Sequence, residues 1–247
     1  MRPPWVIAHR GASGHAPENT FAAFQRAVEL GGTFIETDLH VTRDGRFVAI
    51  HDDTVERTTN GSGDVRNFTL DELREVDAGM WFDRAFMGER IPTLEEVLEF
   101  SREHDVVFYL ELKYAAVWGM DHALVAALQK AQSAPRTIVI SFDPATLTPL
   151  RRLDPSIMTG LLVEDAKPDC IQSAIDLGVR QLCPKVSSVT PELVEKAHRS
   201  DLQVVTWTAN TLADMRAMMA AGVDGIMTDF PDRLRALIED SMANKKA

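Results

Sequence analysis

Short apolar runs alternate with segments of helical periodicity along almost the whole chain. In the first helical segment Phe21, Phe24, Ala27 and Val28 recur at helical spacing, and Gly31 can end the helix. Nine runs of five to eight residues are predicted to be strands: 5–9, 34–41, 47–51, 106–113, 137–142, 158–163, 179–186, 203–208 and 224–228. Repeated strand–helix units of this kind predict a parallel sheet covered by helices.

The number and spread of these units favour a closed barrel over an open sheet. No GxGxxG motif follows the first run, and the units span the whole chain. We therefore predict an α/β fold, a slightly irregular TIM-type (β/α)8 barrel. Nine runs compete for eight places, so one of them, residues 179–186 or an antiparallel extra, is surplus. Residues 41–52 carry a DG turn and leave no room for a helix, which predicts a hairpin between the second and third strands.

Residues 53–91 fit no strand–helix unit, because they are rich in turn formers and hold one short amphipathic helix near 69–76. We predict a single barrel domain, residues 1–247, with 53–91 as a subdomain inserted after the third strand. Insertions at this edge of a barrel usually shape the mouth of the active site. We expect a small core within the insertion, formed by its larger apolar residues: Phe68, Met80, Trp81, Phe82, Phe86 and Met87.

Composition and the lengths of the apolar runs argue against membrane insertion, secretion and nucleic-acid binding. No segment approaches the roughly 18 apolar residues that cross a bilayer, and the first apolar run is too short for a secretory signal. We therefore expect a soluble cytoplasmic protein without stable membrane insertion. The two cysteines, Cys170 and Cys183, lack a CxxC spacing and are expected to be buried free thiols. A net charge of −11 argues against nucleic acid as a partner, but it permits a local basic site for one phosphate group.

Two carboxylates share one face of the second predicted strand. Because side chains alternate along a strand, Glu36 and Asp38 point the same way, about 7 Å apart. Such a pair needs a positive charge between its members, and hard divalent cations, Mg²⁺ or Ca²⁺, bind these oxygens. Acids that face solvent or pair with Arg and Lys are the other interpretation. The pair alone leaves both open.

Further titratable residues lie at the ends of other strands. Glu111 and Lys113 share a face at the end of the fourth run, while His9, Arg10 and His51 follow the first and third runs. Catalytic groups gather at the carboxyl ends of barrel strands, and packing does not explain this pattern. Phosphodiester hydrolysis requires a metal that draws charge from the phosphoryl oxygens, cations that hold the phosphate group, and an acid and a base. The carboxylates could bind the metal, and the Arg, Lys and His residues could supply the other parts.

Other polar residues are expected to be structural. Asn19 or Thr20 can cap the first helix. Glu18 is the exception, since we predict that it belongs to the substrate-binding part of the site and orients Arg10 or another group there. Asp229 ends the last predicted strand, and we expect it to be structural rather than catalytic. The same expectation applies to the remaining histidines: His15, His40, His104, His122 and His198.

Several blocks of the sequence match a known family. They are HRGASGHAPENT at 9–20, ETDLHVTRDGRFVAIHDDTVERTTNGSG at 36–63, IPTLEEVLE at 91–99, LELK at 110–113, SFDP at 141–144, TWTAN at 206–210 and GIMTDFP at 225–231. On these blocks the chain resembles the glycerophosphodiester phosphodiesterases, especially the small cytoplasmic bacterial type. The segment KYAAVWGM, residues 113–120, departs from the family pattern after its first residue.

The resemblance implies an enzyme with a barrel of TIM type that hydrolyses glycerophosphodiesters, such as glycerophosphocholine or glycerophosphoethanolamine, to glycerol 3-phosphate and an alcohol. It implies metal ligands at Glu36, Asp38 and Glu111, catalytic histidines at His9 and His51, phosphate contacts at Arg10 and Lys113, and an aromatic wall beside the glycerol at Trp207.

Two other functions are compatible with the same residues. A lysophospholipase D or a phosphoinositide-type phospholipase on a similar barrel would use the apolar residues of the insertion as a lip for an acyl chain. A phosphodiester-binding protein without activity would keep the site but not turn over. The sequence leaves open the leaving alcohol, the native metal, which histidine is the acid, whether the nucleophile is water or the substrate's own hydroxyl, and whether the chain forms a homodimer.

Overall fold

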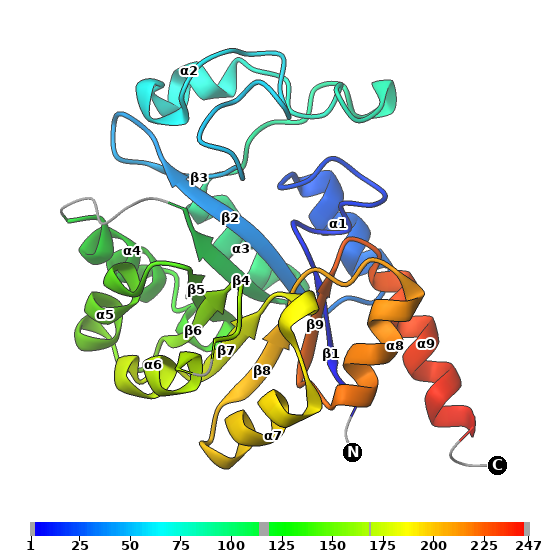
Figure 1. Ribbon diagram of the computed structural model, residues 1–247. Helices are drawn as coiled ribbons and strands as arrows, with labels where there is room; N and C mark the ends of the chain where they lie inside the picture. The colour runs from blue at the N-terminus through cyan, green and yellow to red at the C-terminus, as the bar shows by residue number, and fades with distance from the viewer. Residues whose placement is uncertain (1–2, 114–118, 168, 245–247) are drawn as a thin grey trace.

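Eight parallel strands close into a barrel in the computed structural model, which describes residues 3–113, 119–167 and 169–244 (Figure 1). Their order is β1-β9-β8-β7-β6-β5-β4-β2, and pairing of β1 with β2 closes the ring. The strands are β1 (Trp5–Ala8), β2 (Phe34–Val41), β4 (Val107–Leu112), β5 (Thr137–Ser141), β6 (Met158–Val163), β7 (Gln181–Pro184), β8 (Gln203–Thr206) and β9 (Gly225–Thr228). The predicted barrel is confirmed.

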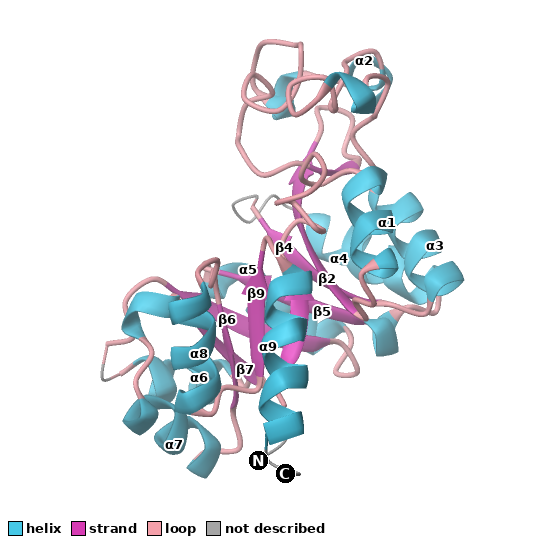
Figure 2. Ribbon diagram, turned by 90° about the vertical axis from the view of Figure 1, so that its right-hand side faces the viewer, coloured by secondary structure: helices cyan, strands magenta, loops and turns pink. Residues whose placement is uncertain are grey.

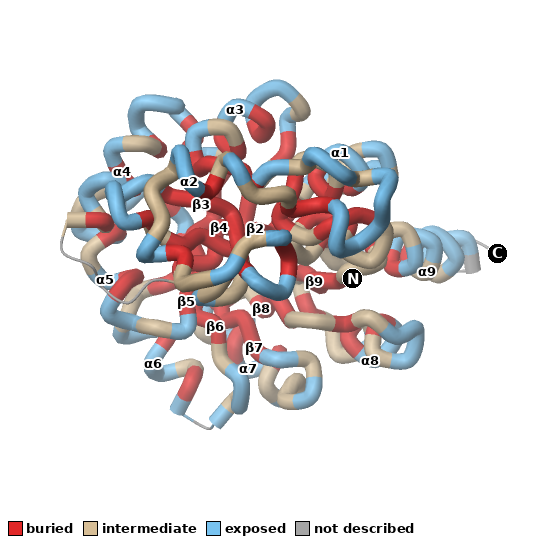
Figure 3. Tube along the Cα trace, turned by 90° about the horizontal axis from the view of Figure 1, so that it is seen from above, coloured by how far each residue is buried: buried red, intermediate tan, exposed pale blue. Residues whose placement is uncertain are grey.

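Helices surround the barrel and cover its outer face (Figures 2 and 3). They are α1 (Phe21–Glu29), α3 (Leu94–His104), α4 (Met120–Lys130), α5 (Pro144–Leu153), α6 (Cys170–Leu177), α7 (Pro191–Arg199), α8 (Leu212–Ala221) and α9 (Pro231–Asn244). Threonine caps the first turn of several, including Thr20 before α1 and Thr93 before α3, whose side chains accept backbone N–H groups. Among the described residues, no helix is both long and apolar enough to span a bilayer.

The surplus predicted strand is the antiparallel one. Strand β3 (Phe47–Ala49) pairs with the end of β2, where Leu39 lies opposite Ala49, and the DG turn connects the two. The strand at Gln181–Pro184, which the sequence left as an alternative, belongs to the parallel barrel. Between β2 and β3 the chain turns back on itself, because this connection is too short to hold the helix that a parallel crossover needs.

Two apolar layers stabilise the barrel. Inside it, Ile7, Tyr109, Ile140, Val205 and Met227 pack together from alternate strand positions. A larger cluster lies between the strands and the helices, and Figure 3 shows the buried strands ringed by helices. The two cysteines are buried and unpaired, as expected.

The segment between β3 and α3 lies on the side of the barrel opposite the N-terminus (Figure 1). It holds α2 (Leu70–Arg74) and the 3-10 turns Val65–Asn67 and Arg84–Phe86; two more such turns, Ala134–Arg136 and Val186–Ser188, occur in the barrel. Its core differs from the prediction, because the buried cluster is mainly aliphatic. The cluster consists of Val48 of β3 together with Ile50, Val55, Val65, Leu73, Ala78 and Ile91.

Most of the large apolar residues expected in that core are exposed instead. Phe68 packs against the aliphatic cluster, but Met80, Trp81, Phe82 and Met87 are exposed. The prediction was wrong because the aliphatic side chains, together with those of β3, are enough to fill so small a core.

Candidate active site

Three carboxylates converge at the carboxyl ends of β2 and β4. The parallel register places Asp38 directly beside Glu111, and Glu36 lies two residues earlier on the same face of β2. One oxygen from each of the three side chains lies within 4.8 Å of the others, and all three residues are buried. Strand alternation and barrel register therefore bring together the acids that the sequence singled out.

This cluster has the properties of a cation site. Within the described part of the chain, the buried Glu36 Oε1 has no hydrogen-bond partner, while Oε2 accepts the Arg10 backbone N–H at 2.9 Å. Burial raises the pKa of Glu36, and the charges of Asp38 and Glu111 raise it further. A free oxygen among mutually repelling buried acids fits a hard divalent ion, so the three residues could hold a metal.

Two cations border the acids. Lys113 Nζ lies 2.6 Å from Glu111 Oε1 and 3.3 Å from Asp38 Oδ1. Arg10 Nε lies 3.3 Å from Asp38 Oδ2. Burial alone would raise the pKa of Asp38, but Arg10 and Lys113 outweigh it and lower the pKa to about 2. The site thus combines a charged carboxylate with two cations that can face a phosphate group.

Arg10 owes its place to an unusual backbone. Directly after β1, Arg10 has φ 58° and Gly11 has φ 80°. A Cβ on Gly11 would lie 2.6 Å from the backbone carbonyl carbon of Ala23, so only glycine fits against α1. This tight turn directs the Arg10 backbone N–H to Glu36 and its guanidinium to Asp38.

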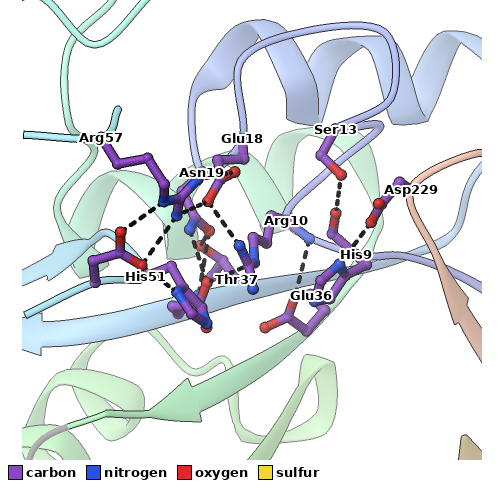
Figure 4. Close-up of polar contacts among 12 residues, drawn as sticks. His9, Arg10, Ser13, Glu18, Asn19, Glu36, Thr37, His51, Arg57 and Asp229 are labelled. Atoms are coloured by element: carbon purple, nitrogen blue, oxygen red, sulfur yellow. Dashed lines mark hydrogen bonds and ion pairs between the residues drawn. The ribbon is translucent and has the colours of Figure 1, made fainter. Parts of the chain in front are cut away.

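His9 faces the same carboxylates through Nε2, and a hydrogen bond at Nδ1 fixes its ring. Its Nε2 lies 3.9 Å from Glu36 Oε2, and its Nδ1 hydrogen bonds Asp229 Oδ1 at 2.7 Å (Figure 4). Asn210 Nδ2 donates to the other Asp229 oxygen at 2.6 Å. Asp229 was expected to be structural, and the one sequence signal for a place in the site is its position at a strand end. In the structure it contacts His9 and so fixes the orientation of that ring.

His51 is held in the same way from the opposite part of the site. It follows β3, and its Nδ1 lies 2.6 Å from Asp52 Oδ1. Burial lowers the pKa of His51, Arg10 and Lys113 lower it further, and Asp38 and Asp52 oppose them. A carboxylate at Nδ1 keeps a proton on that nitrogen, which leaves Nε2 as the atom available for proton transfer.

The loop before α1 supplies two more side chains. Glu18 Oε1 accepts from Arg10 Nη1 at 2.8 Å, as expected for a residue that orients Arg10. Asn19 is not the helix cap, which is Thr20. Its amide instead donates to Asp38 Oδ2 at 2.8 Å and accepts from Thr37 Oγ1 at 2.7 Å (Figure 4). This role of Asn19 was not predicted, because a polar residue beside the start of a helix usually indicates a cap.

Trp207 lies at the same edge of the barrel, two residues after the inward-facing Val205. Its indole N–H donates to the Cys183 carbonyl oxygen at 2.8 Å, and its ring meets Phe142 edge to face at 5.3 Å. The two rings form an aromatic surface at the carboxyl ends of β5 and β8. Residues 114–118 of the divergent loop after Lys113 lie outside the described residues.

The other histidines with described side-chain contacts lie in structural settings. His15 pairs with Asp232, and His198 pairs with Asp224. His40 shares the strand of Glu36, but its Nε2 contacts the His51 backbone carbonyl at 3.0 Å, so it supports the chain beneath His51.

Comparison with known proteins identifies the family of this chain. The model of the glycerophosphoryl diester phosphodiesterase family matches residues 9–233. The chain belongs to this family. It is 41% identical over 235 residues to the glycerophosphodiester phosphodiesterase of Caldanaerobacter subterraneus subsp. tengcongensis, covering 94% of this chain and 97% of the relative. A glycerophosphodiester phosphodiesterase of Bacillus subtilis is 34% identical, covering 92% of this chain and 84% of the relative.

Solved structures share the whole fold. A phosphodiesterase of Oleispira antarctica, in complex with the product sn-glycerol-3-phosphate, superposes with a TM-score of 0.88 at 29% identity, covering 96% of this chain and 97% of the neighbour. The glycerophosphodiester phosphodiesterase of Agrobacterium tumefaciens gives 0.84 at 29% identity, covering 94% and 99%. The predicted family and enzyme class are confirmed: this chain is a hydrolase of the glycerophosphodiester phosphodiesterase family.

Proposed function

We propose that the cluster of Glu36, Asp38 and Glu111, with His9 and His51 beside it, is the catalytic centre for hydrolysis of glycerophosphodiesters to glycerol 3-phosphate and an alcohol. The observation that carries the proposal is the convergence of three buried acids from two strands next to two histidines, each held at Nδ1 by its own aspartate. Such an arrangement supplies charge stabilisation and proton transfer around one phosphodiester.

The three acids are the proposed ligands of one divalent cation, Mg²⁺ or Ca²⁺. The free Glu36 oxygen and the all-oxygen donor set support this assignment. When bound, the ion supplies Lewis-acid stabilisation of negative charge on the phosphoryl group.

Arg10 and Lys113 are the proposed phosphate contacts. Both cations reach the carboxylate cluster, at 3.3 Å for Arg10 Nε and 2.6 Å for Lys113 Nζ. Their side chains are mostly buried, so their charge is screened less by water than that of a surface residue. They would hold the phosphate and neutralise the charge that develops on its oxygens.

The two histidines are the proposed acid and base. One takes a proton on Nε2 from the attacking oxygen, which belongs to water or to the substrate's own glycerol hydroxyl. The other gives a proton from Nε2 to the departing alkoxide, so the alcohol leaves neutral. If the glycerol hydroxyl attacks, a cyclic phosphate forms first and water then opens it, with the two histidines exchanging roles. The aspartates at Nδ1 stabilise the protonated form of each ring.

The substrate would lie with its glycerol against Trp207, and the leaving alcohol would be choline, ethanolamine or a similar group. The decisive assay measures glycerol 3-phosphate released from several glycerophosphodiesters, after EDTA treatment and then with each metal restored. Activity that returns with Mg²⁺ or Ca²⁺ supports the proposed centre. Full activity in EDTA after exhaustive dialysis would remove the metal from the proposal.

A second substrate class is favoured by one observation. Met80, Trp81, Phe82 and Met87 are exposed on the insertion, and this apolar surface suits an acyl chain better than a small polar alcohol. A lysophospholipase D activity would therefore use the same centre. Comparing kcat/KM for glycerophosphocholine and for a lysophosphatidylcholine decides between the two substrates, and Trp81→Ala should lower only the second value.

We also propose a domain organisation and a cellular location for the chain. We treat residues 53–91 as an inserted subdomain of a single barrel domain, which the separate aliphatic cluster of that segment supports. We also place the enzyme in the cytoplasm, with which the two buried, unpaired thiols of Cys170 and Cys183 are consistent.

A further inference from the structure

Arg57 belongs to the insertion but reaches the edge of the catalytic centre. Its guanidinium binds Glu18 through two parallel contacts, Nη1 to Oε2 and Nη2 to Oε1, both at 2.8 Å. On its other side it binds Asp52, with Nε 2.6 Å from Oδ2 and Nη2 3.1 Å from Oδ1. One side chain therefore bridges two carboxylates that come from different loops (Figure 4).

Each of these carboxylates holds a residue of the proposed centre. Glu18 Oε1 also accepts from Arg10 Nη1 at 2.8 Å. Asp52 Oδ1 also contacts His51 Nδ1 at 2.6 Å. The chain of contacts runs from Arg10 through Glu18, Arg57 and Asp52 to His51, so a phosphate contact and an acid–base residue share one central cation.

The shape of the guanidinium matters for this bridge. Its planar fork can meet both oxygens of Glu18 while its remaining N–H groups face Asp52. A lysine ammonium is a point charge and cannot match both carboxylates in this way. Without a cation at this position, Glu18 and Asp52 would each lose two hydrogen bonds and gain freedom to rotate, and they would carry Arg10 and His51 with them.

We infer that Arg57 is a positioning residue that sets the placement of Arg10 relative to His51 and thereby couples the insertion to catalysis. This inference rests on the roles proposed above for Arg10 and His51. Arg57 acts through the two carboxylates and makes no contact with substrate in this assignment.

The test compares steady-state kinetics of Arg57→Ala and Arg57→Lys with wild type on glycerophosphocholine, well below the melting temperature of each protein. Misplacement of catalytic groups by supporting residues typically costs about 10- to 100-fold, and we expect a loss of that size in kcat/KM, mainly in kcat, for Arg57→Ala. Arg57→Lys should recover only part of the lost kcat/KM.

The matched control is Arg43→Ala. Arg43 is a surface arginine of the β2–β3 turn that binds Glu72 and the Asn67 carbonyl oxygen, both of which lie in the insertion. The kcat of Arg43→Ala should stay within about twofold of wild type, as expected away from the centre.

Double substitutions separate positioning from a purely structural role. If Arg57 acts through Asp52 and Glu18, then Arg57→Ala combined with Asp52→Asn, or with Glu18→Gln, should cost less than the product of the two single losses. The inference is overturned if Arg57→Ala keeps kcat within about twofold of wild type, or if the losses multiply in both pairs. His51→Ala and Arg10→Ala are measured alongside. If those two retain full activity, the proposed roles fail, and that outcome is distinct from a failure confined to Arg57.

Discussion

His9 and Asp229 hydrogen bond at 2.7 Å although they lie 220 positions apart in sequence. His9 directly follows β1 and Asp229 directly follows β9, and these two strands are neighbours only because the barrel closes. The contact explains how a histidine at the very start of the chain is held in one orientation.

Replacing Asp229 should therefore impair catalysis without removing a reacting group. We expect Asp229→Asn to lower kcat by about 10- to 100-fold, because the amide no longer stabilises a protonated His9 ring or enforces its Nδ1 proton. The control is Asp232→Asn, which removes the partner of His15 and should leave kcat nearly unchanged. Equal rates for the two variants would show that Asp229 has no part in positioning His9.

The two histidines should be separable from the metal ligands. His9→Ala and His51→Ala should each reduce turnover by about 100-fold or more, the usual contribution of an acid or base. Calorimetric titration with Mg²⁺ or Ca²⁺ should give nearly the same affinity as for wild type, because neither imidazole is a proposed ligand. Unchanged turnover in both variants would refute the assignment.

Metal binding should stabilise the fold in a way that does not depend on activity. At a metal concentration about 100-fold above Kd, the gain in unfolding free energy is about 2.7 kcal/mol, and the melting temperature should rise accordingly. Glu111→Gln should abolish most of this rise. Glu95→Gln, which removes only a surface partner of Arg46, should preserve it. A rise of the same size in Glu111→Gln would exclude that residue as a ligand.

The Asp229 carboxyl group should also contribute to acid sensitivity. Burial raises the pKa of Asp229, but the hydrogen bonds and charge of His9, together with hydrogen bonds from Asn210 and Ser13, outweigh this and hold the pKa below its ordinary value. The resulting stabilisation is complete above the ordinary value of about 3.9 and is lost as pH falls through the lower folded-state pKa. Urea unfolding of wild type and Asp229→Asn from pH 6 to pH 3 should show the gap in stability narrowing below about pH 4. A gap that does not change over this range would contradict the linkage.

Alanine should destabilise the protein more at Gly11 than at Gly45, although the two glycines have similar φ angles. Gly11→Ala combines a positive φ of 80° with a contact at 2.6 Å to the Ala23 backbone. Gly45→Ala in the β2–β3 turn has φ 76° but nothing within 4 Å of the new Cβ. We expect a cost of about 1 kcal/mol for Gly45→Ala and clearly more for Gly11→Ala, measured as unfolding free energies. Equal costs would mean that the turn after β1 can relax.

Local pattern in the sequence was sufficient for much of this architecture. The period-two alternation of the run at 34–41 places Glu36 and Asp38 on one face without any knowledge of the fold. The DG turn at Asp44 and Gly45 predicts the hairpin in the same way. These features depend on residues within a few positions of one another, and so they can be recognised along the chain.

Most partners of the site residues were decided by the tertiary structure. Asp38 lies beside Glu111 because of the register of β2 and β4, and His9 meets Asp229 because the first and last strands pair. Arg57 bridges Glu18 and Asp52 only once the insertion has folded against β3. Alternation determines the face on which a side chain lies, but register and loop packing follow from contacts across the closed barrel, and these bring together residues that no local pattern connects.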